Sequence, residues 1–527
     1  MIVRHRFYWV SCIAIVATIL FGALVTPTSY YLLIIIIPLV LLGLWDCRST
    51  HNILRNYPVI GHIRYMFEFI RPEIQQYFVA TNLSGRPFNR EIRSLVVQRA
   101  KQVNDTHPFG TERDIDEEGY QYLRHSVAVK TVPKTVAHIQ VGGIDCQQPY
   151  LASRLNISAM SFGALSKNAV MALNLGAKLG GFAQNTGEGG LTPYHLKHGG
   201  DIILQLGTAY FGYRTLEGQF DRQLFIEKSQ LPAVKMIEIK ISQGAKPSHG
   251  GLLPAAKITP EIAQIRHIKP YQDCLSPPQH SCFNTPIGLL EFIAELRELS
   301  GGKPVGFKLC IGNEHEFMGI CKAMLKTGIK PDFITIDGAE GGTGAAPLEY
   351  TNRFGVPSNE AIAFAHNCLV GTGLRNDIRL IVSGKVATGF DMILKIALGA
   401  DMCNSARAMM FAIGCIQALR CNTNTCPTGV TTQDPHRMKA IVVEHKAQHV
   451  RNFHHATINS FLDMLGAMGI DDIKDLTPDK IFRRGSDAQS VSYDQLFHFV
   501  AKDCLLRAET VPEHLRAAWD RASAEQF

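Results

Sequence analysis

The sequence predicts an α/β protein, a (β/α)8 TIM barrel preceded by an N-terminal transmembrane helical hairpin. Two observations carry this prediction. Short apolar runs that end in polar or small residues recur between about residues 150 and 415, with helical patterns between them, and two apolar runs without a charge precede them. Regular alternation of strands and helices is typical of a parallel sheet, and eight such units close a barrel.

The two charge-free runs, 7–24 and 30–44, are separated by a short turn and have the composition of membrane-crossing helices. Arginines stand outside them: Arg4 and Arg6 before the first run, and Arg48, Arg55 and Arg64 after the second. Basic flanks tend to stay in the cytoplasm. We therefore expect an anchor in the inner (cytoplasmic) membrane, with the catalytic domain facing the cytoplasm. A signal peptide followed by a buried segment is the alternative.

These patterns divide the chain into four expected parts. They are the transmembrane hairpin at 1–48, an adaptor or linker segment at 49–115, the barrel at 116–470 and a C-terminal helical extension at 471–527. The 13 cysteines show no framework of paired spacings, which favours reduced thiols over disulfides. A net charge of +7 without a single basic tract argues against a nucleic-acid partner.

The functional groups of such a barrel lie where its strands end. The expected strands are 156–160, 182–185, 202–205, 236–240, 305–309, 333–337, 380–383 and 402–405. The residues at their C-terminal ends include Met160 and Ser161, Asn185 to Glu188, Gln205, Lys240 to Gln243, Lys308 and Asp337. Glycine-rich turns follow at 338–344 and 383–385, and their backbone amides favour a phosphate group.

Two of these strand-end residues suit a flavin. Lys308 would place a cation beside the N1–C2 carbonyl edge of the ring, where negative charge gathers on reduction. Gln205 would hydrogen-bond the polar edge of the same ring. Structural roles stay open for both residues: a lysine paired with a neighbouring carboxylate, and an amide that satisfies a loop.

Three cysteines, Cys415, Cys421 and Cys426, lie close together in sequence, and Pro427 follows the last of them. Thiolates are the usual ligands of iron–sulfur clusters. Three ligands suit a 3Fe-4S cluster, or a 4Fe-4S cluster with an outside ligand. A zinc site that recruits His436 and a set of ordinary buried thiols are the alternatives.

Five segments in order, 157–166, 185–190, 243–247, 276–278 and 341–345, resemble the FMN-binding and synthase portion of the glutamate synthase family. The resemblance covers roughly residues 150 to 435. It implies an FMN-containing barrel with a 3Fe-4S cluster held in the loop 415–426. It also implies reductive conversion of 2-oxoglutarate and ammonia to glutamate through 2-iminoglutarate.

The resemblance further implies roles for individual residues. Lys308 would stabilise the reduced flavin, Glu188 and Gln243 would orient the imine or its proton, and Lys246 would pair with a substrate carboxylate. The cofactor-binding residues would be Ser158, Ala159, Met160, Ser161, Asn185, Gln205, Lys240, Lys308, Asp337, Gly341, Gly342, Thr343, Gly384, Lys385 and Arg407. Glu188 has a plain alternative, a carboxylate that pins its own glycine-rich loop.

The chain departs from the family pattern in several places. A membrane hairpin stands where glutamine-dependent members carry an amidotransferase domain, and the C-terminal β-helix domain of those members is not accommodated. Ser248 and His249 replace a Gly-Glu pair, which bears on the substrate. The segment 383–385 replaces Asp-Gly-Gly, which alters the phosphate grip and leaves Lys385 and Arg407 to supply positive charge.

No Gly-x-Gly-x-x-Gly follows an expected strand, so electrons should come from a ferredoxin, a reductase subunit or a quinone. The leading expectation is a membrane-anchored, glutamate synthase-type oxidoreductase whose small molecules are 2-oxoglutarate, ammonia and glutamate. One alternative is a membrane-linked amino-acid or hydroxy-acid dehydrogenase that passes electrons to a quinone or another acceptor. Another is a non-catalytic scaffold that keeps the barrel.

Overall fold

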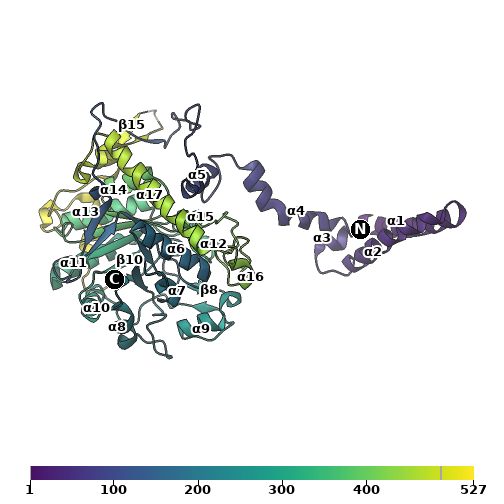
Figure 1. Ribbon diagram of the computed structural model, residues 1–527, viewed down its shortest axis with the longest axis horizontal. Coiled ribbons are helices and arrows are strands. Elements are labelled where there is room, and N and C mark those ends of the chain that lie inside the picture. Colours follow the sequence, from purple (N-terminus) through teal and green to yellow (C-terminus); the bar gives the residue numbers. More distant parts are fainter. Residues whose placement is uncertain (1, 487–488) are drawn as a thin grey trace. The chain divides into compact units, whose positions relative to one another are not determined.

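The computed structural model describes residues 2–486 and 489–527 (Figure 1). The chain forms two compact units, Met1–Arg90 and Glu91–Phe527. The first unit is helical, and the second contains the sheet.

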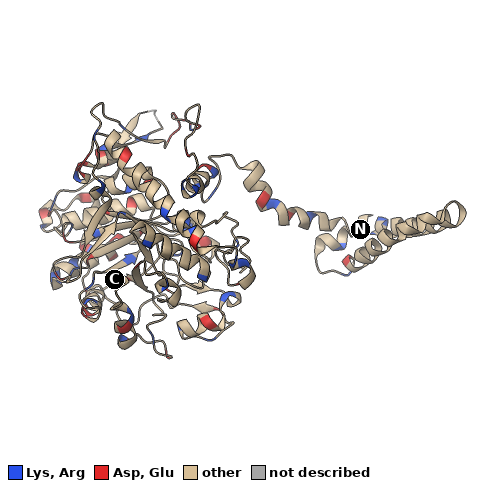
Figure 2. Cartoon of the chain, in the orientation of Figure 1, with Lys and Arg blue, Asp and Glu red and all other residues tan. Residues whose placement is uncertain are grey.

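The first unit opens with two apolar helices joined by a 3-10 turn: α1 (Ile2–Leu24), η1 (Pro27–Leu32) and α2 (Leu33–Asp46). The segments Val3–Leu24 and Pro27–Asp46 have mean hydropathies of 2.2 and 2.1 and are long and apolar enough to cross a membrane. Figure 2 shows that α1 and α2 are almost free of charged residues over most of their length.

Close packing at two glycines makes α1 and α2 a helical pair. A Cβ at Gly22 would come within 2.4 Å of the Tyr30 ring, and a Cβ at Gly43 within 2.2 Å of the Phe7 ring. Each aromatic ring therefore occupies the space that a larger residue would need on the facing segment. The two apolar helices thus have the hairpin arrangement that the sequence predicts.

Three short helical segments complete the first unit: α3 (Asn52–Asn56), α4 (Gly61–Ile74) and the π-helical turn η2 (Gln75–Val79). Gly61 lets α4 begin against α3, because a Cβ at this position would lie 3.0 Å from the Leu54 side chain.

The second unit contains a closed barrel of eight parallel strands in the order β10-β11-β12-β13-β4-β5-β6-β7. The strands are β4 (Leu155–Ile157), β5 (Ala183–Asn185), β6 (Asp201–Leu206), β7 (Val234–Lys240), β10 (Val305–Leu309), β11 (Phe333–Asp337), β12 (Arg379–Ser383) and β13 (Met402–Ser405). The predicted TIM barrel is confirmed, and each expected strand has its counterpart. The first strand ends at Ile157, so Ser158 to Ser161 belong to the loop that follows it.

A β-hairpin of β2 (His138–Val141) and β3 (Tyr150–Ser153) closes one end of the barrel. Val141 and Ala152 of this hairpin share a buried apolar cluster with Ala183 and Phe333, the first residues of β5 and β11. The hairpin therefore covers the N-terminal ends of the strands. The opposite end, where the strands finish, is left for the loops.

Helices alternate with the strands and surround the barrel (Figure 1). They include α6 (Lys167–Gly180), α8 (Arg222–Ser229), α10 (Pro286–Leu299), α11 (Glu314–Thr327), α13 (Ser358–Gly371) and α14 (Gly389–Ala397). The hydroxyl or carboxylate side chains of Ser166, Asp221, Thr285 and Thr388 cap the first turns of α6, α8, α10 and α14. The long helix α17 (Val443–Ala467) packs against α6 and α14.

The last part of the chain contains strands as well as helices. β14 (Ile481–Arg484) pairs with β1 (Gln121–Leu123) and with β15 (Ser490–Ser492) in an antiparallel sheet. The helices α18 (Tyr493–Phe497) and α19 (Glu513–Arg521) follow. The segment expected to be a helical extension is thus partly a sheet, because Ile481 and Phe482 pair with a strand from much earlier in the chain.

Candidate active site

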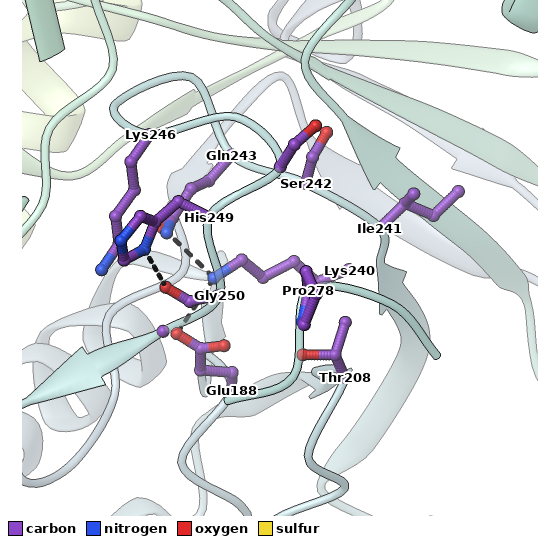
Figure 3. Close-up of a pocket in the computed structure, with 12 residues that line it drawn as sticks. Glu188, Thr208, Lys240, Ile241, Ser242, Gln243, Lys246, His249, Gly250 and Pro278 are labelled. Atoms are coloured by element: carbon purple, nitrogen blue, oxygen red, sulfur yellow. Dashed lines mark hydrogen bonds and ion pairs between the residues drawn. The ribbon is translucent and has the colours of Figure 1, made fainter. Parts of the chain in front are cut away.

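A small recess opens at the ends of strands β6 and β7 (Figure 3). It is lined by Glu188, Thr208, Lys240, Ile241, Ser242, Gln243, Lys246, Ser248, His249, Gly250, Gly251 and Pro278. These residues come from the loops after β5 and β6 and from the long segment after β7. Three of the four residues predicted to be catalytic, Glu188, Gln243 and Lys246, therefore meet in one place.

Glu188, Lys240 and Gln243 form a connected polar group in this recess (Figure 3). The Lys240 ammonium lies 3.0 Å from Glu188 Oε1 and donates to Gln243 Oε1 at 3.1 Å. Burial alone would raise the pKa of Glu188, but the charge and hydrogen bond of Lys240, together with the charges of Arg266 and Lys246, outweigh burial and hold the pKa below its usual value. The Glu188 carboxylate is therefore ionised at neutral pH, and it is paired with Lys240, the last residue of β7, rather than with its own glycine-rich loop.

Glycines make room for the Glu188 side chain. A Cβ at Gly251 would lie 2.5 Å from Glu188 Oε1, and a Cβ at Gly207 would lie 2.7 Å from Glu188 Cβ. Any larger residue at either position would displace the carboxylate from Lys240.

Lys246 is the unsatisfied group of the recess. It is 1 % exposed, and its Nζ has no hydrogen-bond partner within the part of the chain that the structure describes. Burial lowers the pKa of this amine to about 8, against the opposing charge of Glu188. A buried cation without a partner is costly. An anionic ligand in the recess would supply the missing partner.

Lys308, the fourth predicted catalytic residue, lies at the end of β10 beside Asp337 at the end of β11. The Lys308 ammonium is 3.1 Å from Asp337 Oδ2, and Ser383 Oγ and the Gly244 N–H also donate to Asp337 at 2.5 and 3.0 Å. Burial would lower the pKa of Lys308, but Asp337 and other carboxylates raise it. The lysine–carboxylate pairing that the sequence left open is therefore present, and Lys308 carries its charge.

A buried carboxylate that sequence reasoning missed organises the barrel interior. Glu238 on β7 is 1 % exposed and accepts hydrogen bonds from Asn185 at 2.8 Å, Gln205 at 2.6 Å and Thr335 at 2.6 Å. The side-chain N–H groups of Asn185 and Gln205, both predicted to hold a cofactor, thus point to Glu238. The available signal was a glutamate inside the apolar run 236–240.

The loop after β4 carries the first predicted cofactor residues. Ser158 is buried and its N–H donates to Ser405 O at 3.0 Å, while Ala159, Met160 and Ser161 are half-buried. Gly187 has a left-handed φ of 66°, and a Cβ there would lie 2.6 Å from Ser161 N. The loops after β4 and β5 therefore approach each other at a glycine.

The glycine-rich turn after β11 lies against an arginine. A Cβ at Gly342 would meet the Arg407 side chain at 2.9 Å, and the Arg407 guanidinium donates to the Glu340 carbonyl. Gly341 is half-buried, Gly342 and Thr343 are exposed, and Gly344 has open space where a Cβ would stand. An open glycine turn beside a guanidinium is chemistry that suits a phosphate.

The neighbouring predicted turn, 383–385, is arranged differently. Gly384 is buried with a φ of 143°, and a Cβ there would lie 3.3 Å from the carboxylate carbon of Glu340. That carboxylate accepts the Ser358 N–H at 3.0 Å, at the start of α13. Lys385 is exposed with a left-handed φ of 53°. Lys385, Gly342 and Thr343 are thus the exposed members of the predicted set.

The cysteine loop brings its three thiols within electrostatic reach of one another. Burial, together with negative charge on Cys421 and Cys426, raises the pKa of Cys415 to about 12. Burial also acts on Cys426, but hydrogen bonds from Thr431 and Thr428 outweigh it and lower that pKa to about 7. Hydrogen bonds to sulfur favour the thiolate that a metal ligand requires.

The loop is nevertheless not a preformed metal site. Within residues 2–486 and 489–527, no three His, Cys, Asp or Glu side chains are arranged to hold a metal ion. Gln417, Leu419 and Asn424 have left-handed φ values of 58°, 54° and 61°, which non-glycine residues seldom adopt. The donor chemistry suits a cluster, and ligation by the three cysteines stays a prediction.

Two further buried cations near these loops escaped sequence reasoning. Lys257, 1 % exposed, donates to Ala164 O at 2.7 Å and to Cys421 O at 3.2 Å, so it joins the loop after β4 to the cysteine loop. Arg266 donates to Phe162 O at 3.0 Å. Both residues lie in the long segment after β7, where no motif marks them.

The conserved region in glutamate synthase matches residues 92–471 of this chain. The glutamate synthase large subunit-like protein YerD of Bacillus subtilis (strain 168) is 38 % identical over 88 % of this chain and 97 % of its own length. The archaeal-type glutamate synthase [NADPH] of Thermotoga maritima is 34 % identical over 84 % of this chain and 80 % of its own length.

Solved structures align more weakly. A flavocytochrome b2 with pyruvate bound has a TM-score of 0.41 at 12 % identity, covering 79 % of this chain and 85 % of its own. Similarity at this level carries no information about ligand or reaction. The match across residues 92–471 and the B. subtilis relative show that this chain belongs to the glutamate synthase family.

Proposed function

We propose that this protein is a membrane-anchored oxidoreductase, dependent on FMN and an iron–sulfur cluster, that reduces 2-iminoglutarate, formed from 2-oxoglutarate and ammonia, to glutamate. The observation that carries the proposal is the buried Lys246 ammonium without a partner, in a recess that also holds the Glu188–Lys240 ion pair. This arrangement suits a ligand with both an anionic carboxylate and a positively charged nitrogen.

Different residues of the recess would bind different groups of the substrate. Lys246 would accept a substrate carboxylate as its missing partner. Glu188 stays ionised beside Lys240, so it would accept a hydrogen bond from the iminium nitrogen and orient it. Gln243, already bonded to Lys240, would complete the polar wall. His249 also lines the recess, at the position where the family pattern has a glutamate.

The cofactor residues would be those at the neighbouring strand ends and turns. FMN supplies a two-electron reductant when bound, and a 3Fe-4S cluster passes electrons singly. The Gly341–Gly342 turn and Arg407 would hold the phosphate, and charged Lys308 would balance negative charge on the ring. Cys415, Cys421 and Cys426 would hold the cluster. Ser158 to Ser161, Asn185 and Gln205 would line the flavin, with Gln205 and Asn185 fixed by Glu238.

The first unit bears on where the enzyme is located and on its electron-transfer partner. The two apolar helices would anchor the chain in the cytoplasmic membrane with the catalytic unit in the cytoplasm, as the flanking arginines favour. A ferredoxin, a reductase subunit or a membrane quinone would exchange electrons with the cluster.

The test is anaerobic purification in detergent followed by FMN, iron and sulfide analysis, with dithionite and then substrates added. We expect stoichiometric FMN, about three irons, and reoxidation of the reduced flavin by 2-oxoglutarate only when ammonium is present. Flavin reduction by an amino or hydroxy acid without added reductant would instead support a dehydrogenase that feeds electrons to the membrane. Absence of flavin and iron would overturn both functions.

A serine variant tests the cluster separately. Cys421→Ser should lower the iron and sulfide content while FMN is retained, because a serine hydroxyl is a poor cluster ligand. Cys282→Ser, an exposed cysteine outside the loop, is the matched control. Equal iron content in both variants would contradict the proposed ligation.

A further inference from the structure

The helix α4 and the turn η2 expose a continuous apolar stripe. Its members recur three or four positions apart, on one face of a helix: Ile63, Met66, Phe67, Ile70, Ile74 and Tyr77. Five of them, all but Ile70, are between 39 % and 55 % exposed. Scattered exposed apolar residues are ordinary, but a stripe of this length normally packs against something.

A polar side of α4 borders this stripe, although Tyr65 and Phe69, farther round the helix, are also exposed, at 39 % and 69 %. Arg64 lies 3.5 Å from Glu68, one helical turn on, and Arg71 follows on the same side. Both residues of the ion pair are well exposed to solvent. The helix is therefore amphipathic, with long basic side chains beside the apolar stripe. This distribution is typical of helices that lie in a membrane surface rather than across it.

The start of α4 is fastened to the end of α2. Asp46, the last residue of α2, is 1 % exposed, and its Oδ1 lies 2.8 Å from His62 Nε2 in the first turn of α4. Its Oδ2 accepts the Val59 N–H at 2.8 Å. If α2 crosses a membrane, its polar end must lie near the lipid headgroups. The contacts of Asp46 then place the first turn of α4 at the same depth.

We infer that α4 and η2 form an in-plane helix, whose apolar stripe inserts between the headgroups and acyl chains of the phospholipid bilayer that α1 and α2 cross. This inference rests on the proposed membrane anchor. Arg64 and Arg71 would extend from the edge of the stripe to lipid phosphates, with their aliphatic stems along the apolar boundary. The segment is then a second membrane contact.

The occupant of the stripe is lipid for a physical reason. The stripe begins directly after a segment pinned to the polar end of α2, so bilayer lies beside it at high concentration whenever α2 is inserted. Aromatic residues such as Phe67 and Tyr77 are favoured at the headgroup level. A partner protein would have to displace lipid from the same face.

The experiment reconstitutes the full chain into liposomes of phosphatidylcholine and phosphatidylglycerol that contain a phospholipid with a photoreactive diazirine in its acyl chain. After illumination, labelled residues are identified by mass spectrometry. We expect label on α1 and α2 and also on Phe67, Ile70 and Ile74, with little on Arg64 and Glu68. Label on α1 and α2 without label on the stripe would overturn this inference and leave the anchor intact. Loss of label from all these segments would overturn the anchor and this inference together.

Two variants of α4 test the lipid-labelling result further. Phe67→Glu should reduce lipid labelling of the α4 peptide several-fold while labelling of α1 and α2 stays unchanged. Glu68→Gln, on the polar face of the same turn, should leave the pattern of the unaltered chain. Absence of lipid label from α4, together with cross-links between the α4 segments of two copies formed by an added bifunctional reagent, would contradict the inference in favour of self-association.

Discussion

The buried Lys246 ammonium has no hydrogen-bond partner among the residues that the structure describes. Its ionisation should therefore govern substrate affinity. Its pKa is lowered to about 8 by burial, so the free amine is protonated below that pH and neutral above it. The carboxylates of 2-oxoglutarate stay ionised throughout this range. We predict that the KM for 2-oxoglutarate rises as the pH passes upward through about 8, measured from initial rates in the reductive direction.

Two variants separate the charge of Lys246 from its volume. Lys246→Met should raise KM about 10- to 100-fold at neutral pH, the loss expected for one hydrogen bond to a charged group. Lys246→Arg keeps its charge at high pH, so its KM should show no rise near pH 8. The same inflection in the arginine variant would assign the titration to another group.

Glu238 should contribute to stability through the three donors that it satisfies. In Glu238→Gln, one carboxylate oxygen becomes an N–H₂ group: at the Oε1 position it cannot accept from Asn185 or Gln205, and at the Oε2 position it cannot accept from Thr335. We predict a loss of about 1–3 kcal/mol in the free energy of unfolding, the cost of a buried polar group left unpaired. Denaturant unfolding followed by circular dichroism measures it, with exposed Glu291→Gln as a control expected within about 0.5 kcal/mol of the unaltered chain. Equal stability of the two variants would show that the donors find other acceptors.

Sequence reasoning found the residues at the rim of the barrel better than those inside it. Glu188, Gln243 and Lys246 stand in loops after predicted strands, and parallel strands of a barrel bring such loops to one end. Glu238 was passed over because it sits inside an apolar strand, and Lys257 because its partners are remote in sequence. The Lys308–Asp337 pair was left open because adjacency of β10 and β11 fixes no side-chain contact.

At the scale of elements, the packing of α6 on α17 depends on one glycine. A Cβ at Gly176 would lie 2.6 Å from Val450 Cβ and 2.9 Å from Ala447 O, so the helices would have to separate. We predict that Gly176→Ala destabilises the protein by about 1–3 kcal/mol, although alanine is the better helix former. Thermal unfolding against Gly312→Ala, where nothing lies within 4 Å of the added Cβ, is the measurement. A more stable Gly176→Ala variant would mean that the helices readjust without cost.

The strands of the barrel could be predicted because each is an apolar run with a polar end. The short strands outside the barrel could not be predicted in this way. β1, β14 and β15 are only three or four residues long, and β1 pairs with β14 across most of the chain, so no local periodicity marks them. The hairpin of β2 and β3 was missed for another reason: its buried residues Val141 and Ala152 pack against Ala183 and Phe333, which are remote in sequence.

At the scale of the whole molecule, the exposed apolar side chains and the predicted site residues lie in different units. Exposed apolar side chains concentrate in α1, α2 and α4 of the first unit, whereas the predicted catalytic and cofactor residues all lie between 158 and 426, in the second. The proposed membrane insertion and the proposed chemistry at the barrel would therefore be carried by different parts of the sequence.

This separation predicts that the second unit works without the first. A chain beginning at Asn89, just before α5 (Arg90–Lys101), keeps the whole barrel and the small sheet of β1, β14 and β15. Because the exposed apolar helices are removed, it should stay in solution without detergent, bind FMN with the stoichiometry of the full chain and reduce substrate with a soluble artificial donor at a similar rate. It should also lose association with liposomes, measured by flotation, and with it any exchange of electrons with a membrane quinone. Retained flotation would place a membrane-binding surface on the catalytic unit. Loss of both FMN binding and cooperative unfolding would show that residues 1–88 are needed to complete the barrel.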